Sequence, residues 1–274
     1  MESFWEKDRK NYQKFEPIKN NINISICIIG GGLTGLSTAY YLSKETDVVI
    51  VEKDRICSGT SSKTTEKVTS QHGIFYNYLV ESKGKEFAKK YLEANERAIA
   101  NIEKIIKENQ IECDYEKEDS YVFTCQETMV DQIKSEQACI EKISDGKSEF
   151  VKQIDLPIET KGAIKFKNQA QINPLKYAYG LADAVIKKNG KIFENSRVTD
   201  IKKKDNKYVV FANDSKIVAD YVVIATRYPI INIPGYYFLK MYQSTSYAIL
   251  ADVKKDLFDG CYINLETPNL SFRT

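Results

Sequence analysis

A glycine-rich turn between an apolar strand and a helix constrains the fold of this chain more than any other feature. Residues 24–29 form a short apolar run rich in β-branched side chains, which predicts a buried strand. Gly30, Gly32 and Gly35 follow with the spacing GxGxxG. Such glycines permit a tight turn, close approach of a pyrophosphate to the backbone, and close packing of the next helix on the strand. Residues 33–44 are expected to form that helix.

A second apolar strand and an acid complete the motif. Residues 48–51 are apolar and lead into Glu52, 22 residues after Gly30. In dinucleotide-binding folds, an acid about 20 residues after the first glycine binds a ribose hydroxyl. Because strand, turn, helix, strand and acid occur in the required order, we predict a dinucleotide site rather than an ordinary glycine-rich turn. The acid favours FAD or NAD over NADP, whose 2′-phosphate it would repel.

Charge and cysteine content argue against several classes of function. The 274 residues carry 40 basic and 38 acidic side chains, a balance that gives no reason to expect nucleic acid as a partner. No apolar run reaches the roughly 18 residues of a transmembrane helix, and the polar N-terminus lacks a signal-peptide core, so a cytoplasmic protein is expected. The six cysteines and one histidine have none of the usual zinc or iron–sulfur spacings, so no metal site is expected.

The rest of the chain alternates helical and strand-like patterns. Residues 1–21 are expected to be an irregular lead-in, because Pro17 and two asparagines interrupt it. After Glu52 comes a loop rich in Ser, Thr and Gly, which is well placed to run along a pyrophosphate. Further helices are predicted over residues 84–108, 127–143 and 174–188, and strands over residues 120–125, 191–203, 207–214, 216–226, 242–253 and 261–265.

The order of these elements resembles the D-amino-acid-oxidase-like family of FAD-dependent oxidoreductases, which includes glycine and sarcosine oxidases. The resemblance extends over the chain from about Phe15 and rests on IIGGGLTGLSTAYYLS, VVIVEKD, CSGTSSKTTEKVTSQHG, INPLKYAYGLADAVIKKNGKIFENSRVTDI and ADYVVIAT. The loop over residues 58–73 and the run INIPGYYFLK look most like the bacterial branch whose full-length members carry a C-terminal Rieske domain. Members of the family continue beyond position 274, so the resemblance implies that the C-terminal part is lacking.

The resemblance implies an α/β fold in which a Rossmann-like FAD-binding domain holds an inserted α+β substrate domain and is C-terminally incomplete. The expected divisions are a lead-in over 1–21, a discontinuous FAD-binding domain over 22–80 and 171–235, and a partial substrate domain over 81–170 and 236–274.

The resemblance also implies which residues bind the cofactor. The pyrophosphate is expected on the glycine turn, the adenosine ribose on Glu52 and the adenine on the backbone of Val198. The whole expected set is Gly30, Gly31, Gly32, Leu33, Thr34, Gly35, Glu52, Lys53, Ser58, Gly59, Thr60, Lys67, Val198, Ala225 and Thr226. The expected catalytic residues are His72, the only histidine, and Arg273, which would pair with a substrate carboxylate.

The implied reaction is oxidation of an amine or amino acid by hydride transfer to flavin N5, with FAD supplying the redox chemistry. One alternative is a catalytically incomplete nucleotide-binding fragment, or one half of a split flavoenzyme that needs a second chain. Another is an NAD-dependent dehydrogenase, which the inserted domain and the VIAT strand disfavour. The expected partners are the small amine or amino-acid substrate and an electron-acceptor or complementary protein chain.

Overall fold

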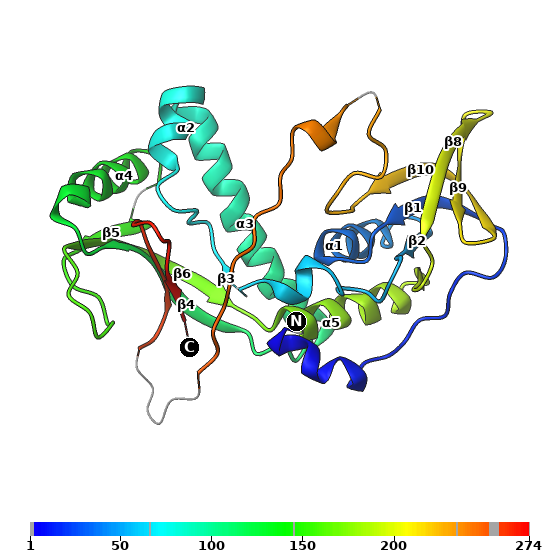
Figure 1. Cartoon of the computed structure of the whole chain (residues 1–274), viewed down its shortest axis with the longest axis horizontal. Helices are drawn as coiled ribbons and strands as arrows, with labels where there is room; N and C mark the ends of the chain where they lie inside the picture. The colour runs from blue at the N-terminus through cyan, green and yellow to red at the C-terminus, as the bar shows by residue number, and fades with distance from the viewer. Residues whose placement is uncertain (1–2, 66, 145, 234, 252–257, 274) are drawn as a thin grey trace. The chain divides into compact units, whose positions relative to one another are not determined.

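Two units, each built around its own sheet, make up the chain (Figure 1). The computed structural model describes residues 3–65, 67–144, 146–233, 235–251 and 258–273. The first unit comprises Met1–Thr65, Asn109–Cys113 and Asn173–Leu250. The second comprises Glu66–Glu108, Asp114–Ile172 and Ala251–Thr274. The chain therefore leaves the first unit and returns to it, as an inserted domain requires.

The first unit has a six-stranded sheet in the order β7-β2-β1-β10-β9-β8. The neighbours β7, β2, β1 and β10 are parallel, whereas β10, β9 and β8 are antiparallel. Parallel strands place their carboxyl ends at one edge, which is where ligands bind in such sheets. The strands are β1 (Ile22–Ile29), β2 (Val48–Val51), β7 (Lys191–Phe193), β8 (Val198–Lys204), β9 (Lys207–Ala212) and β10 (Ser215–Ile224).

Two helices, α1 (Leu33–Leu42) and α5 (Pro174–Lys187), pack against each other in this unit. The buried face of α1 includes Leu36, Ala39 and Tyr40, as the helical spacing predicts. Asn173 caps α5, since its side chain accepts hydrogen bonds from the next two free backbone N–H groups. The described residues of this unit also form the 3-10 helices η1 (Phe4–Asn11), η2 (Thr60–Lys63) and η4 (Tyr237–Leu239).

The second unit has a sheet in the order β12-β11-β4-β6-β3, with β5 also paired to β6. Side chains of α2, α3 and α4 share a buried core with Ile164 and Phe166 of β6. The elements are β3 (Lys67–Val68), α2 (Tyr76–Lys83), α3 (Lys85–Asn109), β4 (Glu116–Thr124), η3 (Glu127–Met129), α4 (Val130–Ile143), β5 (Ser148–Val151), β6 (Gly162–Gln171), β11 (Cys261–Asn264) and β12 (Ser271–Phe272).

The structure confirms the predicted α/β fold class and the strand–turn–helix–strand order around the glycines. The segment 1–21, which was expected to be irregular, instead contains the helix η1. Ser3 N donates to Glu6 Oε2 at 3.1 Å, and Glu6 N donates to Ser3 O at 3.1 Å, which starts this helix. The Ser-x-x-Glu spacing is a known signature of a helix start, so the sequence did contain a signal for η1.

Two predicted strands are wrong. The run over 191–203 splits into β7 and β8, which lie at opposite edges of the sheet, because the segment between them turns away after β7. The segment 242–251 contains no strand, and residues 252–253 lie outside the described part of the chain. Its apolar side chains are not buried among the described residues, since Tyr242 and Ile249 are 92% and 95% exposed.

The boundaries between the two units also differ from the expected ones. Val68 pairs with β6, and Tyr76 lies in the core of the second unit, so residues 67–80 belong there. Residues 236–250 belong to the first unit.

Candidate cofactor site

The glycine turn joins the carboxyl end of β1 to the first turn of α1. Gly30 has φ +109°, a conformation that side-chain-bearing residues rarely adopt. A Cβ on Gly30 would lie 2.7 Å from the carbonyl oxygen of Ala225, and one on Gly35 would overlap the carbonyl oxygen of Gly30. Only glycine therefore allows this turn. A helix start favours an anion, although the N–H groups of Gly31 and Leu33 already donate to Glu52 and Ser61 in this structure.

Glu52 ends β2 beside this turn. Its Oε2 accepts a hydrogen bond from Gly31 N at 2.7 Å, and its Oε1 accepts one from Asp54 N at 3.0 Å. The acid expected to bind a ribose is therefore held next to the glycines. Neighbouring Lys53 is exposed and forms an ion pair with Asp54 at 3.5 Å.

A hydroxyl-rich loop (residues 56–63) covers the glycine turn. Cys57 N donates to Gly31 O at 2.9 Å, and Ser61 Oγ accepts from Leu33 N at 3.1 Å. The structure thus brings the loop that contains Ser58, Gly59 and Thr60 against the turn. Ser61 was missed, although its position inside the same hydroxyl-rich stretch could have indicated it.

The end of β10 forms the next side of the site. Ala225 N donates to Ile29 O at 2.8 Å, which holds the strand end beside the turn. The Thr226 hydroxyl is buried and has no hydrogen-bond partner within the described residues. Arg227, which follows, donates to the Thr60 hydroxyl and so links the strand end to the hydroxyl-rich loop.

Val198 begins β8, where it pairs with Ala212. The segment before it returns to the site, because Ser196 N donates to Glu52 O at 2.8 Å. Within the first unit, the structure therefore gathers the glycine turn, Glu52, the hydroxyl-rich loop, the approach to Val198 and the end of β10.

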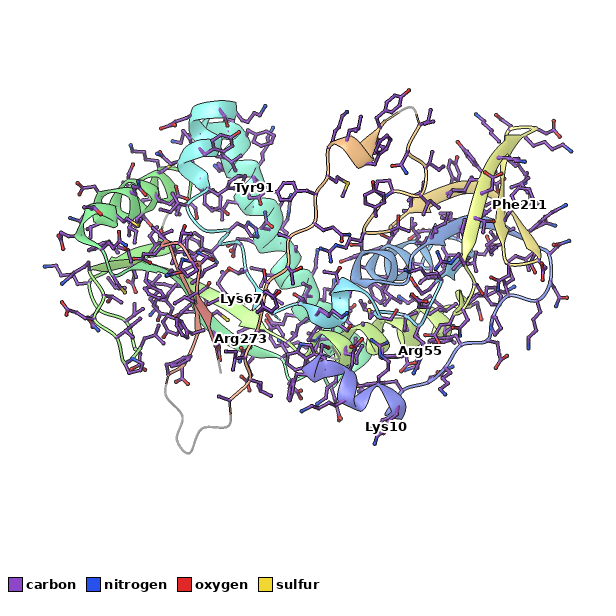
Figure 2. The ribbon with its side chains drawn as sticks, viewed as in Figure 1. Lys10, Arg55, Lys67, Tyr91, Phe211 and Arg273 are labelled. Carbon is purple, nitrogen blue, oxygen red and sulfur yellow. The ribbon has the colours of Figure 1, made fainter. Side chains whose placement is uncertain are left out.

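Three other predicted residues lie in the second unit, and Figure 2 labels two of them, Lys67 and Arg273. Lys67 Nζ donates to Ser271 Oγ at 2.7 Å, and burial lowers the Lys67 pKa. Arg273 directly follows β12, and burial lowers its pKa to about 10. His72 Nδ1 lies 3.0 Å from the Tyr91 hydroxyl, and partial desolvation lowers the His72 pKa. The hydrogen bond to Ser271 thus joins Lys67 to β12, the strand before Arg273, whereas His72 contacts α3.

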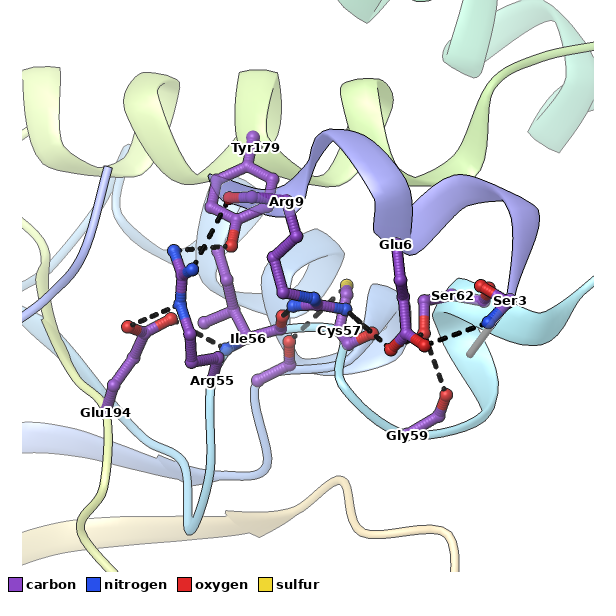
Figure 3. A network of polar contacts seen from close by, with 11 residues as sticks. Ser3, Glu6, Arg9, Arg55, Ile56, Cys57, Gly59, Ser62, Tyr179 and Glu194 are labelled. Atoms are coloured by element: carbon purple, nitrogen blue, oxygen red, sulfur yellow. Dashed lines mark hydrogen bonds and ion pairs between the residues drawn. The ribbon is translucent and has the colours of Figure 1, made fainter. Parts of the chain in front are cut away.

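A polar network on the first unit was not predicted (Figure 3). Glu194 is buried, accepts from Phe15 N at 3.1 Å and Ile56 N at 2.8 Å, and pairs with Arg55 at 3.4 Å. Arg55 also donates to the Tyr179 hydroxyl at 3.0 Å. One signal was available: Glu194 directly follows β7 as Glu52 directly follows β2, so two acids stand at the ends of neighbouring parallel strands.

The residues present fit a dinucleotide with a pyrophosphate. The glycine turn has no Cβ atoms at Gly30, Gly31 and Gly32, so a pyrophosphate can approach its backbone closely. The buried Thr226 hydroxyl at the end of β10 still has hydrogen-bonding capacity. Among the described residues, no group of three or more His, Cys, Asp or Glu side chains is arranged to hold a metal ion.

Residues 25–260 match the family model described as FAD dependent oxidoreductase. The match covers most of the chain, and the fold and the glycine turn agree with it. The chain therefore belongs to this family of FAD-dependent oxidoreductases, and the predicted cofactor, FAD, is confirmed at the level of the family.

Curated relatives match over nearly the same region. The chain is 32% identical over 273 residues to YhfW of Bacillus subtilis (strain 168), whose name describes a Rieske 2Fe-2S iron-sulfur protein; the match covers 99% of this chain and 53% of YhfW. It is 26% identical over 229 residues to the gamma-glutamylputrescine oxidoreductase of Escherichia coli (strain K12), covering 81% of this chain and 53% of that protein. The chain spans about half the length of these relatives.

A solved structure shows the same fold. The L-proline dehydrogenase from P.horikoshii superposes with a TM-score of 0.68 at 19% identity, covering 89% of this chain and 65% of that one. At this identity the likeness supports the fold alone. No helix within the described ranges has the length and apolar character needed to cross a membrane.

Proposed function

We propose that the first unit binds FAD along the edge formed by the ends of β1, β2 and β10. The glycine turn would hold the pyrophosphate, Glu52 the adenosine ribose, and the backbone near Val198 the adenine. The hydroxyl-rich loop would line the path of the ADP and ribitol parts, and Ala225 and Thr226 would lie beneath the cofactor. The observation that carries this proposal is the turn itself, whose backbone must stay free of side chains at Gly30 and Gly35.

We further propose that the second unit is the substrate domain and that the substrate is an amine or amino acid. The relative named for gamma-glutamylputrescine supports this class. Bound FAD would supply the redox chemistry by accepting a hydride. Arg273 remains charged at neutral pH with a pKa of about 10, as an anchor for a substrate carboxylate must. Lys67, as a cofactor-binding residue, and His72, as a catalytic residue, are the other candidates in the second unit.

The visible spectrum of the purified chain, with and without added FAD, tests the proposal. We expect the flavin band to shift on binding and to bleach when an amine or amino acid is added anaerobically. Glu52→Gln should weaken FAD binding by about tenfold or more, because the variant loses a charge-assisted acceptor. Glu45→Gln is the control, since Glu45 is exposed on the same unit. Equal FAD affinity of both variants would contradict the role of Glu52.

One observation favours a second candidate, a half-flavoenzyme completed by another polypeptide segment. Residues 217–219 of β10 pair with both β1 and β9, but the pairing with β9 stops at Ala219 while that with β1 continues to Ile224. Within the described part of the chain, the edge of β10 that faces away from β1 therefore has no strand partner beyond Ala219, and Tyr221 is 68% exposed. Open edges of this kind accept a further strand.

An exposed apolar tract follows this edge. It contains the side chains of Ile233, Leu239, Tyr242, Tyr247, Ile249 and Leu250, each at least 67% exposed. Apolar surface of this extent marks an interaction site. Co-expression with the C-terminal half of YhfW tests this candidate: FAD should be retained only in the co-purified complex. Full FAD retention by the 274-residue chain alone would exclude it.

A further inference from the structure

The N-terminal helix η1 lies against the hydroxyl-rich loop rather than apart from the cofactor site. We call residues 3–13 the N-terminal brace. Ser3 Oγ donates to Ser62 O at 2.5 Å, and Trp5 Nε1 donates to Thr64 O at 3.3 Å. These contacts join segments that lie far apart in the sequence.

Arg9 makes the central contacts of the brace. Its guanidinium donates to Ile56 O at 2.8 Å and to Cys57 O at 2.9 Å. The same group pairs with Glu6 at 3.2 Å, and both side chains are largely buried, at 14% and 13% exposure. A planar guanidinium can make all three contacts at once, whereas an ammonium group has no such fork.

Glu6 fixes the other end of the loop. Its Oε1 accepts from Ser62 Oγ at 3.0 Å, and its Oε2 accepts from Ser3 N. Burial alone would raise the Glu6 pKa, but the hydrogen bonds from Ser3 and Ser62 and the charge of Arg9 lower it below its usual value. The carboxylate is therefore ionised at neutral pH and accepts both bonds.

The loop held by the brace is the one that contacts the glycine turn. Cys57, whose carbonyl accepts from Arg9, donates its own N–H to Gly31 O at 2.9 Å. Ser61, beside the Ser62 held by Glu6, accepts from the first N–H of α1. A displaced brace would thus release both loop contacts at the place where a pyrophosphate would lie.

We propose that Glu6 and Arg9 are positioning residues for the cofactor: they hold the hydroxyl-rich loop against the start of α1 and so set the affinity of the site for the ADP half of FAD. This inference rests on the proposed placement of FAD on the glycine turn. The brace belongs to the first unit, so the effect requires no contribution from the second.

Titration calorimetry with ADP and FAD tests the inference on the full chain. Arg9→Gln should weaken ADP binding at least tenfold. Trp5 is the only tryptophan and lies in the brace, so its fluorescence reports brace attachment directly. We expect a red-shifted Trp5 emission in Arg9→Gln, with a far-UV circular dichroism spectrum like that of the wild type. Arg9→Lys should restore part of the affinity, because it keeps the charge and one carbonyl contact.

Lys10→Gln is the matched control, because Lys10 is exposed on the same helix (Figure 2). If Arg9→Gln fails to fold, Glu6→Gln replaces it, since that variant keeps the shape of the side chain while it removes the charge and one acceptor oxygen, and the same loss of ADP affinity is expected. Wild-type protein that binds neither ADP nor FAD would overturn the proposed function and the inference with it. Wild-type binding with unchanged affinity in the folded Arg9 or Glu6 variant would overturn the inference alone.

Discussion

A backbone carbonyl oxygen decides which residue can stand at position 35. A Cβ there would overlap the Gly30 carbonyl, which belongs to the turn and has little room to move. We predict that Gly35→Ala destabilises the protein by about 1–3 kcal/mol through overpacking and also weakens FAD binding. Thermal unfolding of the apoprotein measures the first effect. For stability alone, Gly59→Ala is the control, since its Cβ would meet nothing within 4 Å; equal destabilisation of both variants would contradict the argument.

Residue-scale electrostatics also make a prediction in the second unit. Glu118 lines an open pocket of about 530 Å³ together with Glu116, Asp119 and Asp259. Burial, and then the charges of Glu116 and Asp259, raise the Glu118 pKa. The folded state therefore binds this proton more tightly than the unfolded state, so stability falls as the pH rises through the raised pKa.

Glu118→Gln should consequently raise the melting temperature at pH 7.5, where the wild-type carboxylate is charged. The difference should vanish near pH 4, where the carboxyl is largely protonated in both states. Calorimetry at the two pH values measures this, with exposed Glu112→Gln as the control. A variant that is less stable than the wild type at pH 7.5 would show that the hydrogen bond from Gln171 to Glu118 outweighs the repulsion.

At the scale of elements, the N-terminus of α2 is capped by a side chain from another helix. Glu136 of α4 is fully buried and accepts from the N–H groups of Phe75, Tyr76 and Asn77, at 2.6–2.8 Å. These are the groups that a helix start leaves without intrahelical partners. The sequence around α2 contains no such cap, which is why this helix was not predicted.

Glu136→Gln should destabilise the protein by about 1–3 kcal/mol, because the new amide group must face a backbone N–H donor. Chemical denaturation measures the free energy of unfolding, and protection of the α2 amides from hydrogen exchange should fall. Glu93→Gln, on the exposed face of α3, serves as the control. A Gln variant as stable as this control would mean that charge at Glu136 is not required.

For the whole molecule, the exposed tract after β10 should govern association. We predict that the chain self-associates in solution at micromolar concentrations, because apolar side chains such as Tyr247 and Ile249 are 87% and 95% exposed. Ile249→Asp with Tyr247→Ser should reduce light scattering without altering the melting temperature. Tyr78→Ser is the control, since Tyr78 is a separate exposed aromatic side chain. Scattering that is equal in all three proteins would contradict an association through this tract.

Local chemistry determined the parts that were predicted correctly. The turn at Gly30 and the acid at Glu52 follow from backbone geometry and spacing within 22 residues, and the Asn173-Pro174 start of α5 follows from capping. Only the tertiary structure decided which distant segments meet. It placed β7 and β8 at opposite sheet edges, the N-terminal brace on the hydroxyl-rich loop, and Glu136 at the start of α2. These contacts join residues tens of positions apart, and burial of the whole chain selects them, so no local pattern encodes them.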